Sequence, residues 1–424
     1  MAVVCAGAIS AHANIITVTN RNDSGPGSLR QALTDASDGD LINFAVTGTI
    51  VLTSGGLVID KSVTISGPGP DRLSIDGNQA QFQCVFGVAD YNMDTVTISG
   101  LTVTNGVCGI FSDHASLTVT NCVVTANKGG SYCGIGINDA RGPTAPVEHR
   151  NDFDAQEGFG DRPAGLATLT IANCVISDNS GSGVQNLSAS VTIIDSTISG
   201  NFADNSQGGF GEGGGIYTSG AKLPGNLTVI NSTISGNFAS FNGGGIASGF
   251  SGLSIVNSTI SGNSTGDPVA GTAGGIGASS VTLLNSTVTG NSAAICGGVC
   301  GGTVEIGNTI LNANASGNID GSVTSHGYNI SSDDGGGHLN GPGDQINTDS
   351  LLGPLRNHGG PTLTHMPMRG SPAIDTGDPN FTPPPDHDQR GACFVRVFGG
   401  RIDVGSVETQ LRPRCVTPAP RPIR

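Results

Sequence analysis

The densest group of residues that could do chemistry lies between residues 318 and 349. It combines carboxylates with imidazoles: Asp320, His326, Asp333, Asp334, His338, Asp344 and Asp349. Paired carboxylates can act as general acid and base on a glycosidic bond, and carboxylate oxygens can also hold a divalent cation. Glycan hydrolysis or metal binding is therefore the chemistry for which this patch must be tested.

A second charged stretch, residues 141–161, reads RGPTAPVEHRNDFDAQEGFGD. Four acids there could bind Ca²⁺ and two aromatic residues could contact a partner, namely Asp152, Asp154, Glu157 and Asp161, and Phe153 and Phe159. An EF-hand loop requires glycine where Glu157 stands, so the spacing does not match that motif. A solvated charged loop is the alternative interpretation.

Two shorter motifs indicate chemistry only weakly. Gly262-Asn263-Ser264-Thr265-Gly266 matches G-x-S-x-G, but no helical pattern or histidine follows it, so it does not predict a nucleophile. Cys296 and Cys300 form a C-x3-C pair, which indicates a metal site only beside a second ligand pair. The sequence therefore assigns no catalytic, cofactor-binding or metal-binding residue.

These candidates must be positioned by a short repeat. The heptad NSTISGN occurs at 231–237 and 257–263, with near-copies at 195–201 and 285–291. The repeats recur every 22 to 36 residues, except for one interval of 52 that contains a charged insertion, residues 141–165. Each period holds an alternating strand such as NLTVI, the heptad, and a Gly-rich strand such as GGGIY. Three short strands per period predict an all-β fold, a right-handed parallel β-helix of the pectin-lyase-like kind.

Period-2 alternation predicts which side chains of each rung face the core. Leu227, Val229 and Ile234 are expected inward, and Thr228, Thr233 and Ser235 outward. The slot that serine occupies in later heptads holds Cys122 and Cys174, which are therefore also expected inward.

The first Asn of each heptad is expected to be an inward amide that stacks on its equivalents, as Asn257 would do. Gly236 and Asn237 are expected to form the corner that ends the strand. On this interpretation the Asn-x-Ser/Thr triplets that open at Asn231, Asn257 and Asn285 are not glycosylation sites.

A solenoid needs capped ends, and the segment GSLRQALTDASDG, residues 27–39, supplies a helical cap. Ser28 and Gln31 form a capping box, and Gly39 is expected to end the helix. Among the cysteines, Cys393 and Cys415 are the preferred disulfide pair. Cys108 and Cys133 lie one period apart, and they could form a disulfide or remain thiols.

Composition excludes several classes of function. The formal charge of −15 leaves no basic patch for nucleic acid. No uninterrupted apolar stretch reaches about 18 residues, so no membrane span is predicted. Residues 190–300 contain no His or Arg, and Trp is absent from the chain, which removes common parts of glycan-cleaving sites.

The N-terminal residues MAVVCAGAISAHAN are typical of a signal peptide that lacks its basic part. Ala11-His12-Ala13 fits the small-x-small pattern of a cleavage site. The alternative is an ordinary N-terminal strand. Export to the cell surface or the medium is the favoured interpretation.

Two segments carry a family resemblance. The N-terminal part resembles a module of bacterial secreted β-helix proteins, over ITVTNRNDSGPGSLRQAL and the residues after it. That module carries a C-S-L-R-E-A motif where this chain has GSLRQA, residues 27–32. Residues 351–378, with DQRG (388–391) and DVGSVE (403–408), are similar to the choice-of-anchor Q domain. The GGGI strands are similar to polymorphic outer-membrane protein repeats. The resemblance implies an exported, surface-associated or released β-helix without assigned catalytic residues, although no cell-surface anchor follows the last residues.

These observations divide the chain into five predicted parts. They are a truncated signal peptide (1–13), an N-terminal cap with the first rungs (14–92), the β-helix repeats (93–330), a choice-of-anchor Q-like module (331–411) and a tail (412–424).

The sequence favours a non-enzymatic, adhesin-like scaffold, acting as a monomer, that binds a surface glycan or a protein ligand. The alternative is a carbohydrate-active β-helix enzyme, either a polysaccharide lyase or a hydrolase. N-x-D, D-D and G-x-H elements in the 318–349 patch resemble those of pectin-degrading hydrolases. However, only 18 residues separate Asp320 from His338, which is less than one rung, so the two cannot stack on one face.

Overall fold

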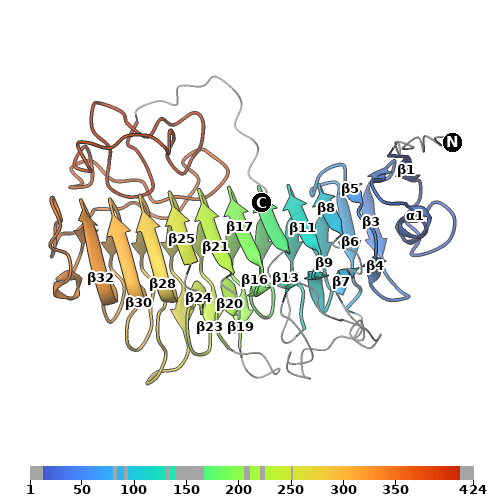
Figure 1. Ribbon diagram of the computed structural model, residues 1–424, viewed down its shortest axis with the longest axis horizontal. Helices are drawn as coiled ribbons and strands as arrows, with labels where there is room; N and C mark the ends of the chain where they lie inside the picture. The colour runs from blue at the N-terminus through green and yellow to red at the C-terminus, as the bar shows by residue number, and fades with distance from the viewer. Residues whose placement is uncertain are drawn as a thin grey trace, which may run out of the picture.

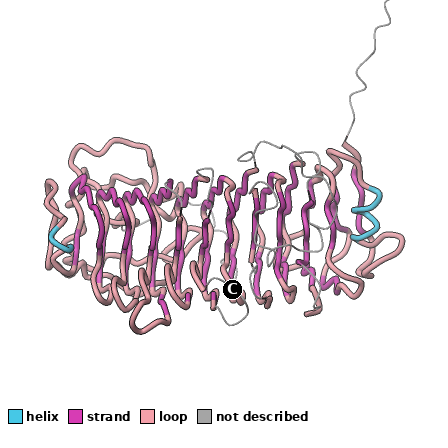
Figure 2. The backbone as a smooth tube through the Cα atoms, turned by 60° about the horizontal axis from the view of Figure 1, so that its bottom comes forward, coloured by secondary structure: helices cyan, strands magenta, loops and turns pink. Residues whose placement is uncertain are grey.

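The protein is a parallel β-helix in which short strands stack along one long axis (Figures 1 and 2). The computed structural model describes residues 13–79, 84–89, 94–129, 134–139, 167–204, 211–219, 225–249 and 252–410. Each strand pairs in parallel with its equivalents in the neighbouring rungs, so that Leu227 lies between Val191 and Leu253.

The largest sheet, sheet 1, has 19 strands in two rows that merge toward the C-terminal end. Row A contains β1 (Ile15–Val18), β2 (Leu41–Phe44), β5 (Thr64–Ser66), β8 (Thr95–Ser99), β11 (Ser116–Thr120), β14 (Thr168–Ala172), β17 (Ser190–Ile194), β21 (Asn226–Ile230) and β25 (Gly252–Val256). Row B contains β4 (Leu57–Ile59), β7 (Cys84–Ala89), β10 (Cys108–Asp113), β13 (Ile135–Asn138), β16 (Val184–Leu187), β20 (Ile216–Ser219) and β24 (Ile246–Ser248). Both rows continue in the long strands β28 (Ile276–Leu284), β30 (Val299–Gly307) and β32 (Ile319–Gly327).

Two further sheets complete each rung. Sheet 2 contains β3 (Gly48–Val51), β6 (Leu73–Asp76), β9 (Thr102–Thr104), β12 (Val123–Thr125), β15 (Val175–Ser177), β18 (Thr197–Ser199), β22 (Thr233–Ser235), β26 (Thr259–Ser261), β29 (Thr287–Thr289), β31 (Ile310–Asn312) and β33 (Ile330–Ser331). Sheet 3 contains β19 (Phe202–Ala203), β23 (Phe238–Ala239) and β27 (Ser264–Thr265). A 3-10 helix, η3 (Gly335–Gly337), follows β33.

The core consists of columns of aliphatic side chains, one from each strand. Leu227, Val229 and Ile234 are completely buried, as the alternation predicts. Burying such a side chain contributes about 1.5–3 kcal/mol, and the repeat makes the same contribution in every rung.

An internal ladder of asparagine amides follows the turn after sheet 2. The Nδ2 of Asn237 donates to the Oδ1 of Asn263 at 2.9 Å and to the carbonyl of Ile198 at 3.0 Å. The Oδ1 of Asn237 accepts from the amide nitrogen and the Nδ2 of Asn201. The same pattern runs through Asn127, Asn179, Asn201, Asn237, Asn263, Asn291, Asn314 and Asn318.

The first Asn of the heptad stacks on its equivalents as predicted, since Asn257 Nδ2 donates to Asn231 Oδ1 at 3.4 Å and Asn308 Nδ2 donates to Asn285 Oδ1 at 2.9 Å. The prediction that this Asn is the inward amide of the core is wrong. Asn231 has φ of 51° and Asn257 of 49°, so both form the left-handed corner before sheet 2. The last Asn of the heptad, Asn237, is the inward amide, because Gly236 with φ of 63° turns the chain back toward the core.

The serine slot faces inward, as predicted, and its hydroxyl groups form a second ladder. The backbone nitrogen of Ser232 donates to Ser258 Oγ at 3.1 Å, and that of Ser258 donates to Ser286 Oγ at 3.2 Å. Cys122 and Cys174 lie in the same column, and both are buried.

The N-terminal end of the core is covered by the helix α1 (Leu29–Asp35). Ser28 Oγ accepts from the Gln31 nitrogen at 3.2 Å, which confirms the predicted N-cap. The Gln31 side chain donates to Asp35 instead of completing the capping box. The helix ends before Ala36, whose nitrogen donates to the Ala32 carbonyl, so the prediction that it continues to Gly39 is wrong.

The C-terminal segment, residues 351–410, folds back over the outer face of sheet 2 (red in Figure 1). Gln389 Nε2 donates to Thr233 Oγ1 at 2.9 Å, and its Oε1 accepts from Thr259 Oγ1 at 2.6 Å. In the next rung the Ser406 nitrogen donates to Thr287 Oγ1 at 3.1 Å. The predicted outward side chains Thr233 and Ser235 are therefore buried beneath this segment.

Two disulfides join described residues. Cys84 and Cys108 face each other in neighbouring strands of row B, with Cα atoms 4.3 Å apart. Cys296 bonds to Cys300, so these residues form a disulfide and not a metal site. Cys415 and Cys133 lie outside the described residues, so the predicted Cys393–Cys415 pair stays a prediction. No helix in the described part of the chain is long and apolar enough to span a membrane.

The ladder predicts that the two asparagines of one heptad differ in their contribution to the free energy of unfolding. Asn237→Ala removes a fully buried amide and leaves its partners unsatisfied, so the free energy of unfolding should fall by about 3 kcal/mol. Asn231→Gly keeps the positive φ and removes a half-buried amide, so its loss should stay within about 1 kcal/mol. Denaturant unfolding measures both variants. A loss at Asn231 equal to that at Asn237 would contradict the ladder assignment.

Candidate functional site

A groove opens on the outer face of row B, where the Gly-rich strands begin. In each of these rungs two glycines precede the inward isoleucine, as Gly214 and Gly215 precede Ile216. A Cβ on either glycine would collide with the backbone of the next rung at Gly244 and Gly245. The strands β20, β24, β28 and β30 follow these glycines, and in each strand the residue after the inward aliphatic residue faces the groove.

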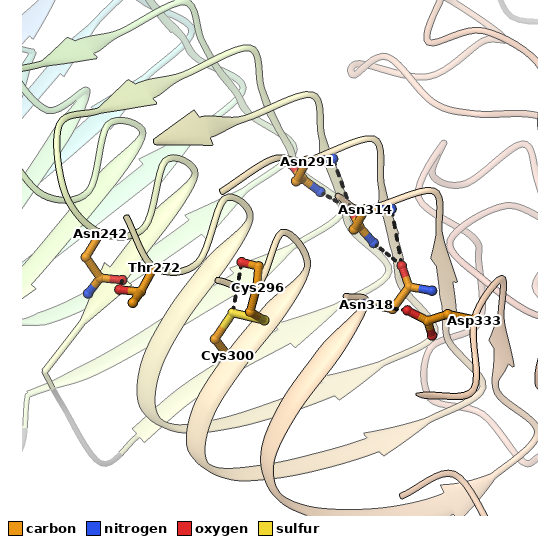
Figure 3. Close-up of a disulfide and its surroundings, with 8 residues drawn as sticks. All are labelled: Asn242, Thr272, Asn291, Cys296, Cys300, Asn314, Asn318 and Asp333. Carbon is orange, nitrogen blue, oxygen red and sulfur yellow. Dashed lines mark hydrogen bonds between the residues drawn. A yellow bond between two sulfur atoms is a disulfide. The ribbon is translucent and has the colours of Figure 1, made fainter. Parts of the chain in front are cut away.

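The groove exists because the outward side chains of this column become small. Tyr217, Ala247, Gly277 and Cys300 are partners in register along successive rungs. Tyr217 closes one end, and the Cys296–Cys300 disulfide lies at the other (Figure 3). The hollow between them has a volume of about 670 Å³.

One wall of the groove is a column of polar side chains that precede the glycines. Glu212, Asn242 and Thr272 are joined from rung to rung by parallel bridges. Thr272 Oγ1 donates to Asn242 Oδ1 at 3.0 Å (Figure 3), which leaves the Nδ2 hydrogens of Asn242 for other acceptors. Ser219, Gly249, Ser279 and Gly302 line the opposite side.

The groove contains one carboxyl group among the described residues that line it. Burial raises the pKa of Glu212 above its ordinary value. Burial also raises the pKa of Tyr217, and the charge of the nearby Glu212 acts in the same direction. Burial thus shifts both groups toward their neutral forms, and both side chains can take part in hydrogen bonds with a ligand.

The 318–349 patch is not an assembled catalytic site. Asp333 Oδ2 accepts from the Asn318 nitrogen at 2.9 Å, so this carboxylate ends the asparagine ladder (Figure 3). Asp344 Oδ1 accepts from the nitrogen and the Nδ2 of Asn329, the last member of the serine-slot ladder. Burial favours a higher pKa for Asp333, but hydrogen bonds from Ser331, Gly335 and Asn318 outweigh it and lower the pKa.

The other residues of the patch are dispersed. Asp320 lies exposed beside Cys300 in row B, and His326 Nε2 lies 3.4 Å from Glu305 Oε2 on the continuation of row A. Asp334 accepts from Gly336 at the start of η3, and Asp349 accepts from the nitrogen of Leu351. The proposed calcium-binding or partner-binding loop, residues 141–165, lies outside the described residues.

A buried charge network holds the C-terminal segment together. Asp388 and Arg390 form an ion pair with Nη2 and Oδ2 2.6 Å apart. Glu408 accepts from the nitrogens of Phe398 and Asp403. The segments DQRG and DVGSVE are thus brought together, because the Glu408 nitrogen donates to Asp388.

Carboxylate oxygens of Asp375, Asp403 and Glu408 lie within 4.8 Å of one another. Arg396 is buried beside this cluster; burial lowers the pKa of its guanidinium, and the charges of Glu408, Asp388 and Asp403 oppose that shift. We therefore assign this cluster to the stability of the segment.

Ser261 and His365 form a hydrogen-bonded pair at the covered face of sheet 2. Ser261 Oγ lies 2.9 Å from His365 Nε2, and His365 Nδ1 lies 2.7 Å from the carbonyl oxygen of Gly353. This arrangement resembles a nucleophile and its base, but Ser261 is only 8% exposed beneath the C-terminal segment. The pair fastens the segment to β26. Ser264 of the G-x-S-x-G match lies in β27, in the regular stack of sheet 3.

Sequence reasoning missed the groove residues because it treated the repeats as structural and sought function in the parts that do not repeat. The signal is the column that precedes the glycines, where EGGGIY, NGGGIA and TAGGIG align. In these three segments the residue after isoleucine changes from Tyr217 to Ala247 to Gly277, which indicates a hollow once the rungs are stacked.

Comparisons with known proteins identify the fold. No family model and no curated protein sequence matches the chain. The pectate lyase Pel9A matches with a TM-score of 0.53 and 15% identity, over 94% of this chain and 96% of that one. The major allergen from cedar pollen, Jun a 1, has a TM-score of 0.35 at 13% identity over 73% of this chain and 80% of that one. Tailspike protein 3 of bacteriophage CBA120 has a TM-score of 0.36 at 12% identity over 71% and 54%. The match to Pel9A, with the parallel sheets, confirms the predicted right-handed parallel β-helix.

Asp333 and its neighbour Asp334 should differ in their effect on stability, because only Asp333 caps the asparagine ladder. Asp333→Ala leaves the backbone nitrogen of Asn318, the last member of the ladder, without its acceptor and should lower the free energy of unfolding by about 2–3 kcal/mol. Asp334→Ala removes an exposed acceptor and should lower it by less than about 1 kcal/mol. Chemical denaturation of both variants measures the difference. Comparable losses at the two positions would refute the capping role.

The buried Glu408 predicts a pH dependence of stability. Burial, with the charge of Asp403, raises the pKa of Glu408 from 4.5 to about 8, against the opposing effect of Arg396. The folded state then keeps a proton that the unfolded chain releases, so this stabilisation is present below pH 4.5 and is lost as pH rises through about 8. Thermal unfolding should show a falling Tm between pH 5 and pH 8.

Glu408→Gln is the matched test, because glutamine cannot titrate. It should lower Tm at every pH, since one of the two backbone donors at Glu408 would face an amide NH2, but the slope against pH should be smaller. Asp349→Asn, at an exposed carboxylate, serves as the control and should leave the slope unchanged. A slope in Glu408→Gln equal to that of the wild type would rule out this origin.

Proposed function

We propose that this protein is a non-catalytic β-helix scaffold that binds an extended glycan chain in the groove of row B. The groove runs along the helix axis because equivalent residues of successive rungs line it, at a spacing of about 4.8 Å. Its lining of hydroxyl, amide and backbone groups matches the donors and acceptors of a polysaccharide.

The observation that carries this proposal is that the described residues lining the groove include a single carboxyl group. Glycoside hydrolases use two carboxyl groups about 5–10 Å apart, and the described lining residues supply only Glu212. Lyase chemistry needs a base and a cation that stabilises the carbanion, and those lining residues include no Lys, Arg or His. Binding without cleavage is therefore favoured over the carbohydrate-active enzyme, although Pel9A is a pectate lyase by name.

We also propose that the scaffold works outside the cell, at the surface of a bacterium or released from it, as an adhesin-like module. The signal-like N-terminal sequence and the resemblance to the choice-of-anchor Q domain support this localisation. The two disulfides Cys84–Cys108 and Cys296–Cys300 support it independently, because disulfides persist mainly in oxidising compartments.

Binding to immobilised and soluble glycans tests the proposal. Asn242→Ala removes free amide donors from the groove wall and should weaken binding of the selected glycan about tenfold, which corresponds to about 1.4 kcal/mol. Asn226→Ala changes an exposed asparagine on row A and should leave affinity unchanged. Isothermal titration calorimetry gives both dissociation constants.

Product analysis of the same mixtures tests whether the protein cleaves the glycan or only binds it. Reducing ends and unsaturated products should not accumulate during prolonged incubation with the bound glycan. Sustained turnover that Glu212→Gln abolishes would replace the binding proposal with an enzymatic one. Equal affinities of the wild type and Asn242→Ala would remove the groove as the binding site.

A further inference from the structure

Resting on the proposed function, we infer that the groove selects uncharged glycan chains over polyuronides, and that Glu212 sets this preference. This preference is the opposite of that expected for a groove that binds a polyanion.

The described residues that line the groove offer no cation to an acidic chain. Among these residues the ionisable groups are Glu212 and Tyr217, and Cys300 is bonded to Cys296. Each ring of a polyuronide carries a carboxylate, and two like charges 4 Å apart repel by about 1–4 kcal/mol between bulk water and a protein surface. The formal charge of −15 on the whole chain adds to this repulsion at low salt.

Glu212 stands at the first position of the polar wall, in line with Asn242 and Thr272. Its carboxyl is half-buried near Tyr217, and burial raises its pKa. A carboxyl group accepts hydrogen bonds in either state and also donates one when protonated, so it can pair with the hydroxyls of a neutral chain. A uronate carboxylate placed against it would bring a negative charge that no described lining residue pairs.

Exposed apolar side chains run along the edge of the same wall. Phe241, Val269 and Ile295 are 38%, 81% and 50% exposed, and they come from three successive rungs. The Thr272 nitrogen donates to the Phe241 carbonyl, and the Ile295 nitrogen donates to that of Gly271, so the edge adjoins the polar wall. Neutral pyranose rings present C–H faces and hydroxyl rims together, which this pairing of apolar and polar surfaces can accommodate.

The test uses oligosaccharide pairs that share a backbone and differ only in the carboxyl group at C6. Homogalacturonan is compared with its full methyl ester, and cello-oligosaccharide with cellouronate, by calorimetry on the full chain at 0.15 M salt. The wild type should bind the neutral member of at least one pair about tenfold more tightly than the acidic member.

Glu212→Lys should reduce that preference about tenfold or reverse it, because it places a cation on the groove wall. Glu305→Lys makes the same change of net charge on the exposed outer face of β30, away from the groove lining. It should alter the preference by less than about twofold, since charges beyond about 8 Å are screened at this salt. Glu212→Gln keeps the shape of the side chain and removes its charge, so it should shift the preference in the same direction as Glu212→Lys but by less, and it keeps the inference testable if the lysine variant misfolds.

Phe241→Ala should weaken binding of the neutral chain at least threefold, while Phe202→Ala, at an exposed phenylalanine of sheet 3 that does not line the groove, should not. Equal binding of both members of each pair, or equal shifts in Glu212→Lys and Glu305→Lys, would overturn the inference and leave glycan binding itself intact. Failure of every oligosaccharide to bind would overturn the proposed function, and the inference with it.

Discussion

The rest of the structure depends on one buried interaction, the column of asparagine amides that runs from Asn127 to Asn318. From Asn179 to Asn314, each Nδ2 donates to the Oδ1 of the next member and to a carbonyl of the preceding rung, and each Oδ1 accepts from both nitrogens of the member before it. At the last member, Asn318, the backbone nitrogen donates to Asp333 Oδ2, and the side-chain Nδ2 donates to Ser331 Oγ and Ser332 Oγ. The apparent catalytic carboxylate is thus a consequence of the ladder, because a negative group accepts the last backbone donor better than another amide would. The serine-slot ladder obeys the same rule and ends on Asp344.

Because the interior columns stay constant, the outward residues of successive rungs can vary in size, and this variation produces the groove. The inward isoleucines Ile216, Ile246 and Ile276 hold three rungs in register, with their strands at the same spacing. The next residue outward therefore changes size without disturbing the core. Tyr217, Ala247 and Gly277 form a descending series, and the space that opens is lined by groups the repeat already supplies at fixed offsets. A binding site on such a scaffold requires no inserted loop, because a column of outward residues that vary in size beside a constant inward column is sufficient.

The repeat period, the aliphatic columns and the serine slot could be predicted from the sequence because period-2 alternation holds within a strand. The same rule fails at the corners. Alternation extended from Ile234 toward the N-terminus correctly predicts that Ser232 faces inward. Asn231 no longer belongs to the strand, because its positive φ makes the turn. Counting forward fails at Gly236, because a left-handed residue reverses the sense in which the next side chain points. The inward position of Asn237 follows from that reversal, which composition does not reveal. The disulfide partner of Cys108 was missed for a related reason, since Cys84 precedes the recognisable repeats.

The C-terminal segment decides which outer face remains available to a ligand. Sheet 2 also carries hydroxyl columns, at Thr233, Thr259 and Thr287, and on their own these would offer a polysaccharide as many donors as row B does. Gln389 and Ser406 use those hydroxyls instead, and Ser261 is taken by His365. The network of Asp388, Arg390 and Glu408 holds Gln389 in place, so the DQRG and DVGSVE segments act by closing one face of the solenoid. The face over β20, β24, β28 and β30 is left with its hydroxyl, amide and carboxyl groups toward solvent, and for that reason the ligand is to be sought there.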